Sequence, residues 1–557
     1  MLKEELAKTV ALALERAKAS GDLNIEETPE IQIEVPKNRN FGDFSTNIAL
    51  VLAGTVGRQP REVAQTIVNL IDTKEGLIEK VEIAGAGFIN FRINPKWYQQ
   101  VIKRIHAEAE SYGTSKKHVG ESILIEYVSA NPNGPITVGS GRGGVIGDVI
   151  ANLLDAVGYR VYREYYINDA LNSLQMQNFG KSLEVRYLQA LGHDAKMPED
   201  GYQGEYVIQI AKEIVARDGD KYLQMSKSER VRLFTDMGEA AMLEMQKKDL
   251  ADIGIIFDNW YSERTLHESG KVAKVIETLK QRGYAYEKDG AVWLKSTAFG
   301  DDKDRTLIRS NGQPTYIAAD AAYHKDKFDR GFDRLLNVWG PHHHGYIART
   351  KAAVAALGYD PDKLEVLIFQ VVRLFSGGEL VMMSKRRGDL VPLSELVKEV
   401  GRDAARYFLL MRSADSSLDF DLELAKQQSS ENPVYYVQYA HARICSILRS
   451  AAEEGTECPS AEKTDLSHLS HPSEIELIRK LAEWPEEVER AADLREPHRL
   501  TAYATELAAI FHAFYRDCRV LGEQSELTAA RLVLVQAARI TLANVLKMMG
   551  VSAPERM

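Results

Sequence analysis

Glycine, proline and hydroxyl residues are concentrated in the stretch SANPNGPITVGSGRGGVIGD, which spans residues 129–148. The stretch follows an apolar run at residues 123–128 that is typical of a buried strand, and it leads into residues 145–157, whose pattern predicts a helix. A glycine-rich turn between a strand and a helix is a common phosphate site, because the free N–H groups and the dipole of the helix favour an anion there. The turn therefore predicts a phosphate-binding site.

The same turn also matches a dinucleotide-binding fingerprint. Gly139, Gly141 and Gly144 form a GxGxxG pattern, and Glu164 ends the next predicted strand at residues 161–165, where that fingerprint places an acidic residue. An oxidoreductase that uses NAD or FAD is therefore an alternative. Three features weigh against it. The glycines begin well beyond the strand, after two prolines, and a second phosphate-type loop lies far downstream. The strand end also carries Glu126, Ser129 and Asn131, polar groups that a tight dinucleotide turn does not require.

That second loop is the stretch GGELVMMSKRRGDLVPLSEL, residues 377–396. It leads from a glycine turn through Met383, Ser384 and Lys385 into a basic pair, and a predicted helix follows. A mobile loop that carries a lysine can close over phosphates whose charge changes during a reaction. Most basic clusters of this kind are solvated surface, so the loop indicates phosphate chemistry only in combination with the turn at residues 129–148.

The elements that must position these loops divide the chain into three parts. Residues 1–112 mix helix and strand, residues 113–395 alternate strands and helices, and residues 396–557 are helical in pattern. A charged helical stretch at about residues 170–255 has the pattern of an insertion into the middle part. The chain has 557 residues, enough for roughly three to four domains. The predicted fold is an α/β core with a parallel sheet, an N-terminal α+β unit and a C-terminal all-α bundle.

Composition narrows the class of protein. The formal net charge of −10 argues mildly against non-specific binding of nucleic acid. The three cysteines contain no CxxC pair, which indicates neither a disulfide framework nor a zinc site. There is no run of about 18 or more apolar residues, and the N-terminal helix contains acidic residues and lacks the apolar core of a signal peptide. We therefore expect a cytoplasmic protein without a membrane segment.

The turn and the downstream loop together resemble the HIGH and KMSKS signatures of class I aminoacyl-tRNA synthetases. Along nearly its whole length, the chain resembles the arginyl-tRNA synthetase family. The stretches that carry the resemblance are NFGDFSTNIAL (40–50), GAGFINFRI (85–93), SANPNGP (129–135), REYYINDA (163–170), GQPTYIAADAAYHKDKF (312–328), NVWGPHHHGY (337–346), NPVYYVQYAHARI (432–444), LREPHRLTAYATELAAIFHAFYRDCRVL (494–521) and GVSAPERM (550–557). The resemblance implies a Rossmann-type (HUP-like) class I catalytic core between a tRNA-binding accessory domain and an anticodon-binding bundle.

The resemblance also implies a reaction and its partners. ATP, accompanied by Mg²⁺, and L-arginine form arginyl-adenylate and pyrophosphate, and the arginyl group then moves to the 3′ end of the tRNA for arginine. In this family the tRNA is typically needed even for the first step. No zinc, NAD or flavin is implied, and a monomer is the family default.

Recognition of arginine requires planar acceptors for a guanidinium and another group for the ammonium. Glu126 and Asn131 straddle the end of the first strand of the middle part, with Ser129 between them. Tyr316 and Asp320 share a face if their segment is helical. The resemblance implies that these residues line the arginine pocket.

Two other interpretations of the pocket carboxylates remain. Asp320 could pair with a structural cation such as Arg309 or Lys325. Asp320 and Glu126 could instead form an acid/base pair, but formation of an adenylate needs no general base, because arginine attacks as a carboxylate. We therefore prefer the binding role.

Three consecutive histidines, residues 342–344, suggest a metal site. Adjacent side chains on a regular strand alternate between its faces, so they cannot all reach one ion. The resemblance places the cluster at the wall of the active site, with His343 near the arginine or the ribose. For His342, a structural role is about equally plausible.

The two phosphate signatures depart from the family pattern. Where the family usually has His-Val-Gly-His, this chain has Thr137-Val138-Gly139-Ser140, and Met382 replaces the first lysine of KMSKS. One missing oxyanion-type donor typically costs about 2.7–4 kcal/mol of transition-state stabilisation. The resemblance implies that ATP contacts Pro132, Thr137, Gly139, Ser140, Met383, Ser384 and Lys385.

Two hypotheses follow from these replacements. In the preferred one, the two hydroxyls donate in place of the imidazoles, with help from backbone N–H groups, Lys385 and either Arg386 or Arg142. Gly139 is then needed because a side chain there would meet the adenine. In the other, the chain is a catalytically impaired, synthetase-like protein that only binds tRNA or arginine.

Contacts with tRNA are implied by the resemblance rather than by charge. Asn40 and Phe41 belong to the accessory domain that docks on the tRNA elbow. Tyr435 and Tyr439 share a face of a predicted helix and can stack on unpaired bases, with His441 and Arg443 close by; the resemblance places Met557 and Arg556 near the anticodon loop. A tyrosine stripe is often core, so we expect one of Tyr435, Tyr436 and Tyr439 to be buried.

Overall fold

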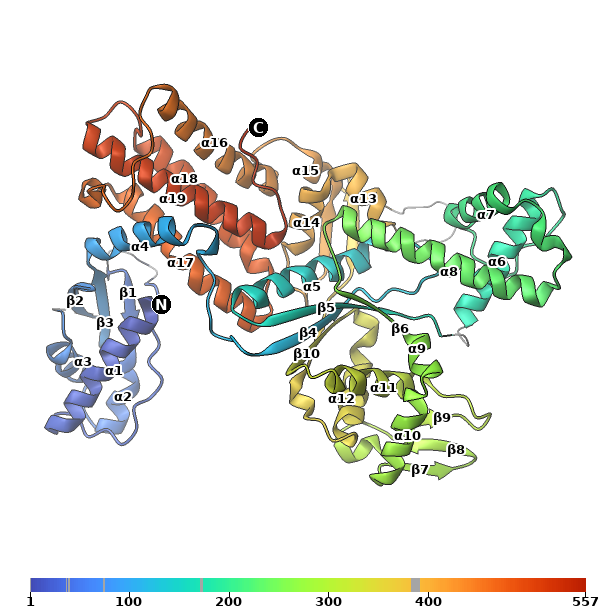
Figure 1. The fold of residues 1–557 in the computed structure, drawn as a ribbon. Coiled ribbons are helices and arrows are strands. Elements are labelled where there is room, and N and C mark those ends of the chain that lie inside the picture. Colours follow the sequence, from blue (N-terminus) through green and yellow to red (C-terminus); the bar gives the residue numbers. More distant parts are fainter. Residues whose placement is uncertain (1, 37, 39–40, 74–75, 171–173, 382–390) are drawn as a thin grey trace.

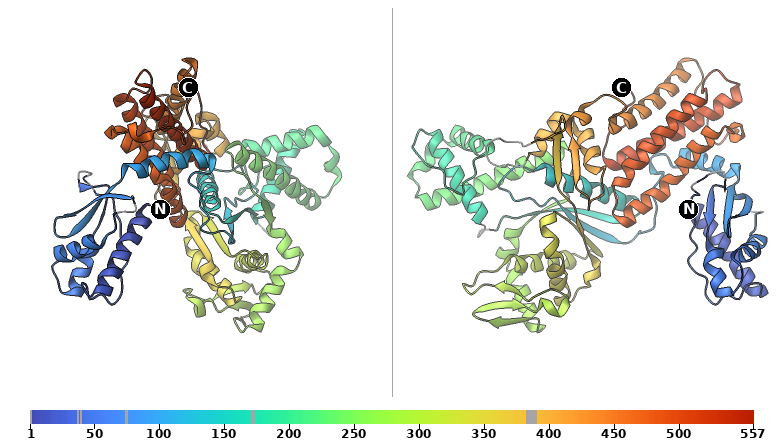
Figure 2. Two further views of the ribbon diagram at one scale, coloured as in Figure 1. Left: turned by 60° about the vertical axis from the view of Figure 1, so that its left-hand side comes forward. Right: turned by 180° about the vertical axis from the view of Figure 1, so that it is seen from behind.

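The computed structural model describes residues 2–557 except 37, 39–40, 74–75, 171–173 and 382–390. Three parts of the chain form separate lobes around a central parallel sheet (Figure 1). The N-terminal unit and the helical insertion lie at opposite ends of the molecule, as both views in Figure 2 show.

The N-terminal unit pairs helices with a small antiparallel sheet. Its three strands are ordered β1-β3-β2 and both pairings are antiparallel. Its elements are α1 (Leu2–Ser20), β1 (Phe44–Thr46), α2 (Ile48–Val56), α3 (Pro60–Leu70), β2 (Ile78–Ala84) and β3 (Phe88–Ile93). Helix α4 (Pro95–Glu108) then leads away from the unit and packs against two helices of the C-terminal bundle, α17 (Pro472–Leu494) and α19 (Ser525–Met549).

The central sheet has five parallel strands in the order β11-β10-β4-β5-β6. They are β4 (Ser122–Tyr127), β5 (Arg160–Ile167), β6 (Asn259–Ser262), β10 (Arg334–Trp339) and β11 (Leu364–Ile368). Chain order proceeds from β4 to β5 on one side and returns to β10 on the other, so β4 and β10 flank the point where the strand order reverses. In open α/β sheets ligands bind at the carboxyl ends of the strands at such a point.

The predicted helix after β4 begins earlier than its apolar pattern indicates. Helix α5 spans Val138–Ala156, so it takes in the glycines of the turn, and Thr137 is its N-cap. Added Cβ atoms at Gly141 and Gly147 would lie 2.6 Å from Leu393 Cδ1 and 2.5 Å from Tyr127 Cγ. These glycines therefore serve close packing of α5, and the sequence pattern missed the first two turns because Val138 is their only apolar side chain.

The insertion is a helical lobe with its own core. Its main helices are α6 (Leu174–Ala190), α7 (Glu205–Asp218) and α8 (Lys227–Asp252). Buried Phe179, Tyr187 and Phe234 pack among them. Helix α8 runs from the far end of this lobe back to the central sheet (Figure 1).

A second subdomain lies below the central parallel sheet in Figure 1 and has a hydrophobic core of its own. Its elements are α9 (Glu263–Glu268), α10 (Lys271–Gln281), β7 (Ala285–Lys288), β8 (Ala291–Leu294), β9 (Arg305–Ile308), α11 (Tyr316–Asp329) and α12 (Ile347–Ala356). The strands β7, β8 and β9 form an antiparallel sheet.

The rest of the chain forms a short connecting region and a helical bundle. The connecting elements are β12 (Val372–Ser376), β13 (Glu379–Leu380), α13 (Leu393–Val400), α14 (Arg402–Leu410), β14 (Leu418–Asp421) and α15 (Leu422–Lys426). The bundle consists of α16 (Pro433–Glu453), α17, α18 (His498–Asp517) and α19. The expected fold class, an α/β core between an α+β unit and an all-α bundle, is confirmed.

Helix α19 corrects the expectation that no segment is apolar enough to cross a membrane. By length and composition it could do so, but 67% of its most apolar window is buried inside the structure. It contacts α4, α16, α17 and α18. A core helix of a bundle is apolar on most of its faces for that reason.

Candidate active site

Glu126 lies at the end of β4, beside the reversal of strand order, and is buried. Its Oε2 accepts a hydrogen bond from Lys327 Nζ at 2.6 Å, and its Oε1 accepts one from Ser129 Oγ at 3.0 Å. Lys327 is fully buried, and it also donates to Asn337 Oδ1 at 3.0 Å and lies 4.1 Å from the centre of the Tyr323 ring. Glu126 is therefore held as one half of a buried ion pair.

Tyr316 and Asp320 lie one turn apart on α11, as the helical spacing predicts. Tyr316 is the first residue of the helix and is 65% exposed. Burial, followed by the charge of Glu126, raises the pKa of Asp320 to about 7, although Lys327 and Arg349 act in the opposite direction. Asp320 is thus a carboxyl group that would gain from a bound cation.

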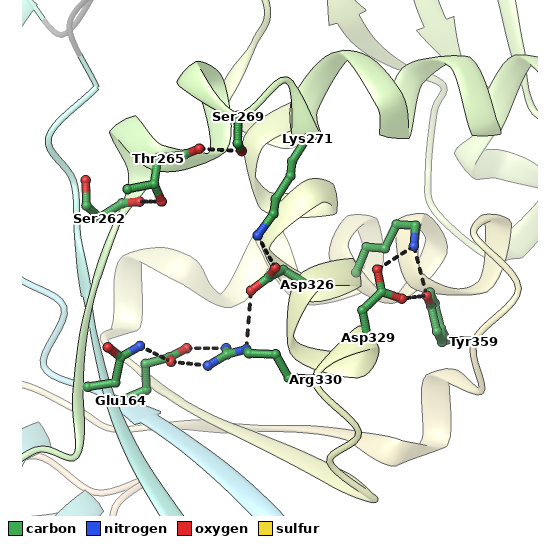
Figure 3. Close-up of polar contacts among 11 residues, drawn as sticks. Glu164, Ser262, Thr265, Ser269, Lys271, Asp326, Asp329, Arg330 and Tyr359 are labelled. Carbon is green, nitrogen blue, oxygen red and sulfur yellow. Dashed lines mark hydrogen bonds and ion pairs between the residues drawn. The ribbon is translucent and has the colours of Figure 1, made fainter.

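The alternative pairing of Asp320 with Lys325 is wrong. Lys325 Nζ instead donates to Asp329 Oδ2 at 2.7 Å and to the Tyr359 hydroxyl at 3.2 Å (Figure 3). Among the described residues, Arg309 has no ion pair with Asp320 either.

Glu263 is a carboxylate of this site that the sequence analysis missed. It is the first residue of α9, directly after β6, and is buried. Burial raises its pKa to about 7, and the charges of Asp320 and Asp169 add to the effect. The sequence signal was an acidic residue directly after a strand of the parallel sheet, at the same edge as Glu126.

Asn131 and His343 are two further residues that were expected in the arginine pocket. Asn131 is exposed, and its side-chain amide donates to Gln175 Oε1 at 2.7 Å. His343 is exposed and lies near Trp339, with ring centres 6.0 Å apart. Burial lowers the pKa of His343, while the charge of Glu126 raises it, which places the imidazole within electrostatic range of the pocket.

The three histidines do not lie on a strand, so the geometric argument made for them was wrong. They occupy a 3-10 helix, Pro341–Tyr346. In the described part of the chain, no group of three or more His, Cys, Asp and Glu residues is arranged to hold a metal ion.

The two hydroxyl groups at the start of α5, those of Thr137 and Ser140, differ in their hydrogen bonds. Thr137 Oγ1 accepts the backbone N–H of Ser140 at 3.1 Å and donates its own hydrogen to Ser140 Oγ at 3.2 Å. Both side chains are partly exposed. A Cβ at Gly139 would meet only Thr137 Oγ1, at 3.8 Å, so packing within the protein does not require glycine there.

Arg142 is not available to phosphates, contrary to one of the expectations above. Its guanidinium is buried and donates to the carbonyl oxygens of Gln370, Ser413 and Ser416 at 2.8–2.9 Å. It ties α5 to the connecting region, which is a structural role.

The two residues that directly follow the undescribed part of the downstream loop, Val391 and Pro392, contact the start of α5. Val138 N donates to Val391 O at 2.9 Å, and Thr137 forms a β-bridge with Pro392. The expected site residues Met383, Ser384 and Lys385, together with Met382 and Arg386, lie outside the described residues.

Glu164 contradicts the dinucleotide alternative. It is fully buried and binds Arg330 through both oxygens, at 2.6 and 2.8 Å, and it accepts from Asn259 Nδ2 at 2.8 Å (Figure 3). Arg330 bridges in turn to Asp326 at 3.2 Å. Glu164 therefore belongs to a structural ion-pair network and is closed to a ribose.

The bundle carries a cleft of about 900 Å³. Its polar and aromatic lining comprises Tyr439, Arg443, Ser446, Arg449, Ser450, Tyr515, Arg516, Arg519 and Arg556, and Met557 also lines it. The Arg443 guanidinium lies between two rings, 5.1 Å from the centre of Tyr439 and 5.0 Å from that of Tyr515. This surface offers flat rings and several cations, which suits unpaired nucleotides.

The tyrosine stripe differs from expectation in one respect. Tyr435 and Tyr439 do share a face, with parallel rings 6.2 Å apart, but none of the three tyrosines is buried. His441 is buried instead, binds Pro554 O, and has a pKa lowered by burial, so it is not a cation of the cleft. In the N-terminal unit Phe41 is 55% exposed, and Asn40 lies outside the described residues.

Comparisons with known proteins agree over the whole chain. Residues 3–93, 101–444 and 437–557 match the models of the arginyl tRNA synthetase N terminal domain, the tRNA synthetases class I (R) catalytic domain and the DALR anticodon binding domain. The arginine–tRNA ligase of Moorella thermoacetica is 51% identical over 555 residues, with 100% of this chain and 99% of the relative covered. That of Carboxydothermus hydrogenoformans is 49% identical, with 100% of both chains covered.

The solved structures show the same fold. The arginyl-tRNA synthetase of Thermus thermophilus superposes with a TM-score of 0.75 at 23% identity, with 100% of both chains covered. The family models together span nearly the whole chain, and the relatives are about 50% identical over its full length. These matches exclude the alternative that the chain is an oxidoreductase. This chain therefore belongs to the arginyl-tRNA synthetase family of class I ligases.

Proposed function

We propose that this chain activates L-arginine with ATP and transfers it to tRNA, and that Ser140 and the first N–H groups of α5 take over the role of the missing histidines. The observation that carries this proposal is the Thr137–Ser140 pair. Because Thr137 gives its hydrogen to Ser140 Oγ, the hydrogen of Ser140 is left for an oxygen of ATP. A helix N-terminus adds N–H donors for the same oxygens.

The arginine pocket is proposed to consist of Glu126, Ser129, Asn131, Tyr316, Asp320, His343 and Glu263. Among the described residues, no Lys or Arg forms an ion pair with Asp320 or Glu263, and only His267 lies near Glu263, at 3.7 Å, so both carboxyl groups suit the guanidinium. Glu126 is already neutralised by Lys327, so we assign it to orienting Ser129 and to the ammonium group.

The chemistry follows from this placement. A carboxylate oxygen of arginine attacks the α-phosphorus of ATP, the bond to the bridging oxygen breaks, and pyrophosphate leaves. The 3′-terminal ribose hydroxyl of tRNA then attacks the carbonyl carbon of arginyl-adenylate, and AMP leaves. Donors that lie ready where phosphate charge develops lower the barrier of the first step. Mg²⁺ bound to the ATP phosphates supplies further neutralisation of charge.

The remaining expectations belong to the same proposal. ATP contacts are proposed for Pro132, Thr137, Gly139, Ser140, Met383, Ser384 and Lys385. Contacts with tRNA are proposed for Asn40, Phe41, Tyr435, Tyr439 and Met557. We further propose domain boundaries at residues 112 and 395, an insertion at about 170–255, and a cytoplasmic monomer that does not bind a membrane.

The test is ATP–pyrophosphate exchange by the purified full chain, with arginine and with or without tRNA for arginine. Exchange that needs arginine and tRNA is the expected result. If arginine or tRNA binds but no exchange is detected at any enzyme concentration, the chain is a binding protein on a synthetase frame, and the proposal is wrong.

A further inference from the structure

The turn after β4 begins with two strained residues. Val128 has a φ of 69° and Ser129 a φ of 44°. This left-handed region is unfavourable for residues with a Cβ, and most of all for a β-branched residue such as valine. Backbone strain of this kind persists only where the surrounding structure holds the chain in place. The contacts that hold this turn therefore indicate which residues shape the site.

Strand β5 supplies the first set of contacts. Tyr165 is fully buried, and its hydroxyl accepts the N–H of Ala130 at 3.1 Å. Its ring is stacked on Trp260 with centres 4.1 Å apart, so the hydroxyl has little freedom to move. Ser129 is held as well, because its Oγ accepts the N–H of Tyr166 at 3.1 Å.

Helix α8 of the insertion supplies the second set through one side chain. Gln246 is fully buried, and its Nε2 donates to Asn131 O at 3.0 Å and to Gly134 O at 2.8 Å. Its Oε1 lies 2.9 Å from the Tyr165 hydroxyl, whose single hydrogen is shared between this oxygen and Ala130 O, also at 2.9 Å. Both amide hydrogens and the amide oxygen are thus engaged, which fixes the orientation of the amide.

The rest of the insertion holds the same turn. Asn131 Nδ2 donates to Gln175 Oε1 at 2.7 Å, and Asn133 Nδ2 donates to the Tyr202 hydroxyl at 3.0 Å. The Tyr206 hydroxyl donates to Asn133 O at 2.9 Å. Residues from α6, from the segment before α7, from α7 and from α8 therefore all bind the turn.

We infer that Tyr165 and Gln246 are positioning residues for arginine activation, and that the insertion serves to hold the turn at residues 128–134 in its strained form. The turn carries Ser129 and Asn131 at one end and runs into the cap of α5 at the other. Its shape thus sets the distance between the arginine carboxylate and the α-phosphate. A shift of about 1 Å between reacting groups can cost on the order of 100-fold in rate. This inference rests on the activity proposed above.

The test compares Tyr165→Phe and Gln246→Met with a matched control, Tyr187→Phe. Tyr187 is also fully buried and donates to a backbone carbonyl, Gly219 O, but within the core of the insertion. Each variant is assayed by ATP–pyrophosphate exchange with tRNA present, for tRNA affinity by filter binding, and for its melting temperature. We call Tyr165 and Gln246 together the clamp, and we expect kcat to fall about 10- to 100-fold in each of the two clamp variants, Tyr165→Phe and Gln246→Met. In the control, kcat should stay within about twofold at a similar loss of melting temperature, and tRNA affinity should be unchanged in all three.

The double variant completes the test. If the two side chains act as one clamp, Tyr165→Phe combined with Gln246→Met loses little more kcat than the worse single variant. Losses that multiply, or clamp variants that keep kcat within about twofold of wild type while only the melting temperature falls, would overturn the inference. If the wild-type chain shows no exchange, the proposed activity and this inference are both wrong. If the wild-type chain is active but the variants behave otherwise than expected, only this inference is wrong.

Discussion

Thr137 donates its hydroxyl hydrogen to Ser140 Oγ across 3.2 Å and accepts the backbone N–H of Ser140 at 3.1 Å. The two hydroxyls that stand where the family usually has histidines are therefore not equivalent. Thr137 is committed to the cap of α5, and Ser140 keeps a hydrogen that, among the described residues, has no acceptor.

Ser140→Ala should consequently lower activation more than Thr137→Ser does. The alanine variant loses a donor to the developing phosphate charge, which typically costs about 2.7–4 kcal/mol, whereas serine at position 137 keeps the cap. Single-turnover formation of arginyl-adenylate measures the difference. Equal rates for Ser140→Ala and wild type would show that the backbone N–H groups suffice.

Restoring the imidazole is the complementary experiment. Ser140→His should raise kcat for exchange, because the resemblance to the HIGH signature implies an imidazole donor at this position. The same substitution should leave the melting temperature nearly unchanged, since Ser140 is partly exposed. A fall in kcat would indicate that the surroundings have adapted to a hydroxyl.

Gly139→Ala and Gly141→Ala should separate ligand binding from packing. A Cβ at position 139 meets nothing closer than 3.8 Å, so stability should be unchanged or rise by up to about 1 kcal/mol, the helix propensity of alanine over glycine. The KM for ATP should rise, because we propose that the nucleotide fills this space. At position 141 the Cβ would lie 2.6 Å from Leu393 Cδ1, so about 1–3 kcal/mol of stability should be lost. Urea unfolding and exchange kinetics measure both effects.

Arginine binding should weaken as the pH falls through about 7. Burial raises the pKa values of Asp320 and Glu263 to about 7, and the charge of Glu126 adds to the first shift and that of Asp320 to the second. Below that pH the free enzyme holds protons that a bound guanidinium must displace, so the Kd for arginine rises. Calorimetry in buffers of different ionisation enthalpy should detect proton release on binding between about pH 6 and 7. A Kd that is constant from pH 6 to 8 would contradict this assignment.

The same shifts predict an effect on the stability of the free enzyme. The unfolded chain has ordinary carboxyl pKa values, so between about pH 4 and 7 the folded state binds more protons, and stability falls as the pH rises. Asp320→Asn removes the cost of ionising this group and should raise the melting temperature at pH 8 while it abolishes arginine binding. Arginine should raise the melting temperature of wild type but not of this variant.

Lys327→Met should be strongly destabilising. Lys327 is the fully buried partner of Glu126, and removing one member of a buried ion pair typically costs about 3–5 kcal/mol. The double variant Lys327→Met with Glu126→Gln leaves no unpaired charge and should recover much of the stability in urea unfolding. Exchange activity should stay low in the double variant, which separates folding from function.

Tyr439→Ala should weaken tRNA binding without affecting arginine. Stacking of a base on an aromatic ring is worth about 1–3 kcal/mol, and the Tyr439 ring lines the cleft next to Arg443. Filter binding of tRNA and the KM for tRNA in aminoacylation measure the loss. The matched control is Tyr286→Ala, because Tyr286 lies on strand β7 of the antiparallel β7-β8-β9 sheet and not in the C-terminal bundle. Equal tRNA affinities for the two variants would remove Tyr439 from the interface.

The sequence by itself determined the family, the fold class and most of the candidate pocket. Glu126, Tyr316 and Asp320 were identifiable because they stand in motifs with local spacing, at the end of an apolar strand and one turn apart on a helix. The pair Thr137 and Ser140 was identifiable because it fills positions that the family reserves for histidine. Local pattern is sufficient when neighbouring residues in the chain are also neighbours in space.

Only the tertiary structure decided which of these groups are free to bind. Lys327 reaches Glu126 from another element, and the Arg142 guanidinium binds three distant carbonyl groups. Glu263, at the start of α9, is close enough to Asp320 for the charge of Asp320 to raise its pKa. The hold of Gln246 on the turn links residues that are more than a hundred positions apart. Burial and partner choice depend on contacts between segments distant in sequence, and no local spacing encodes them.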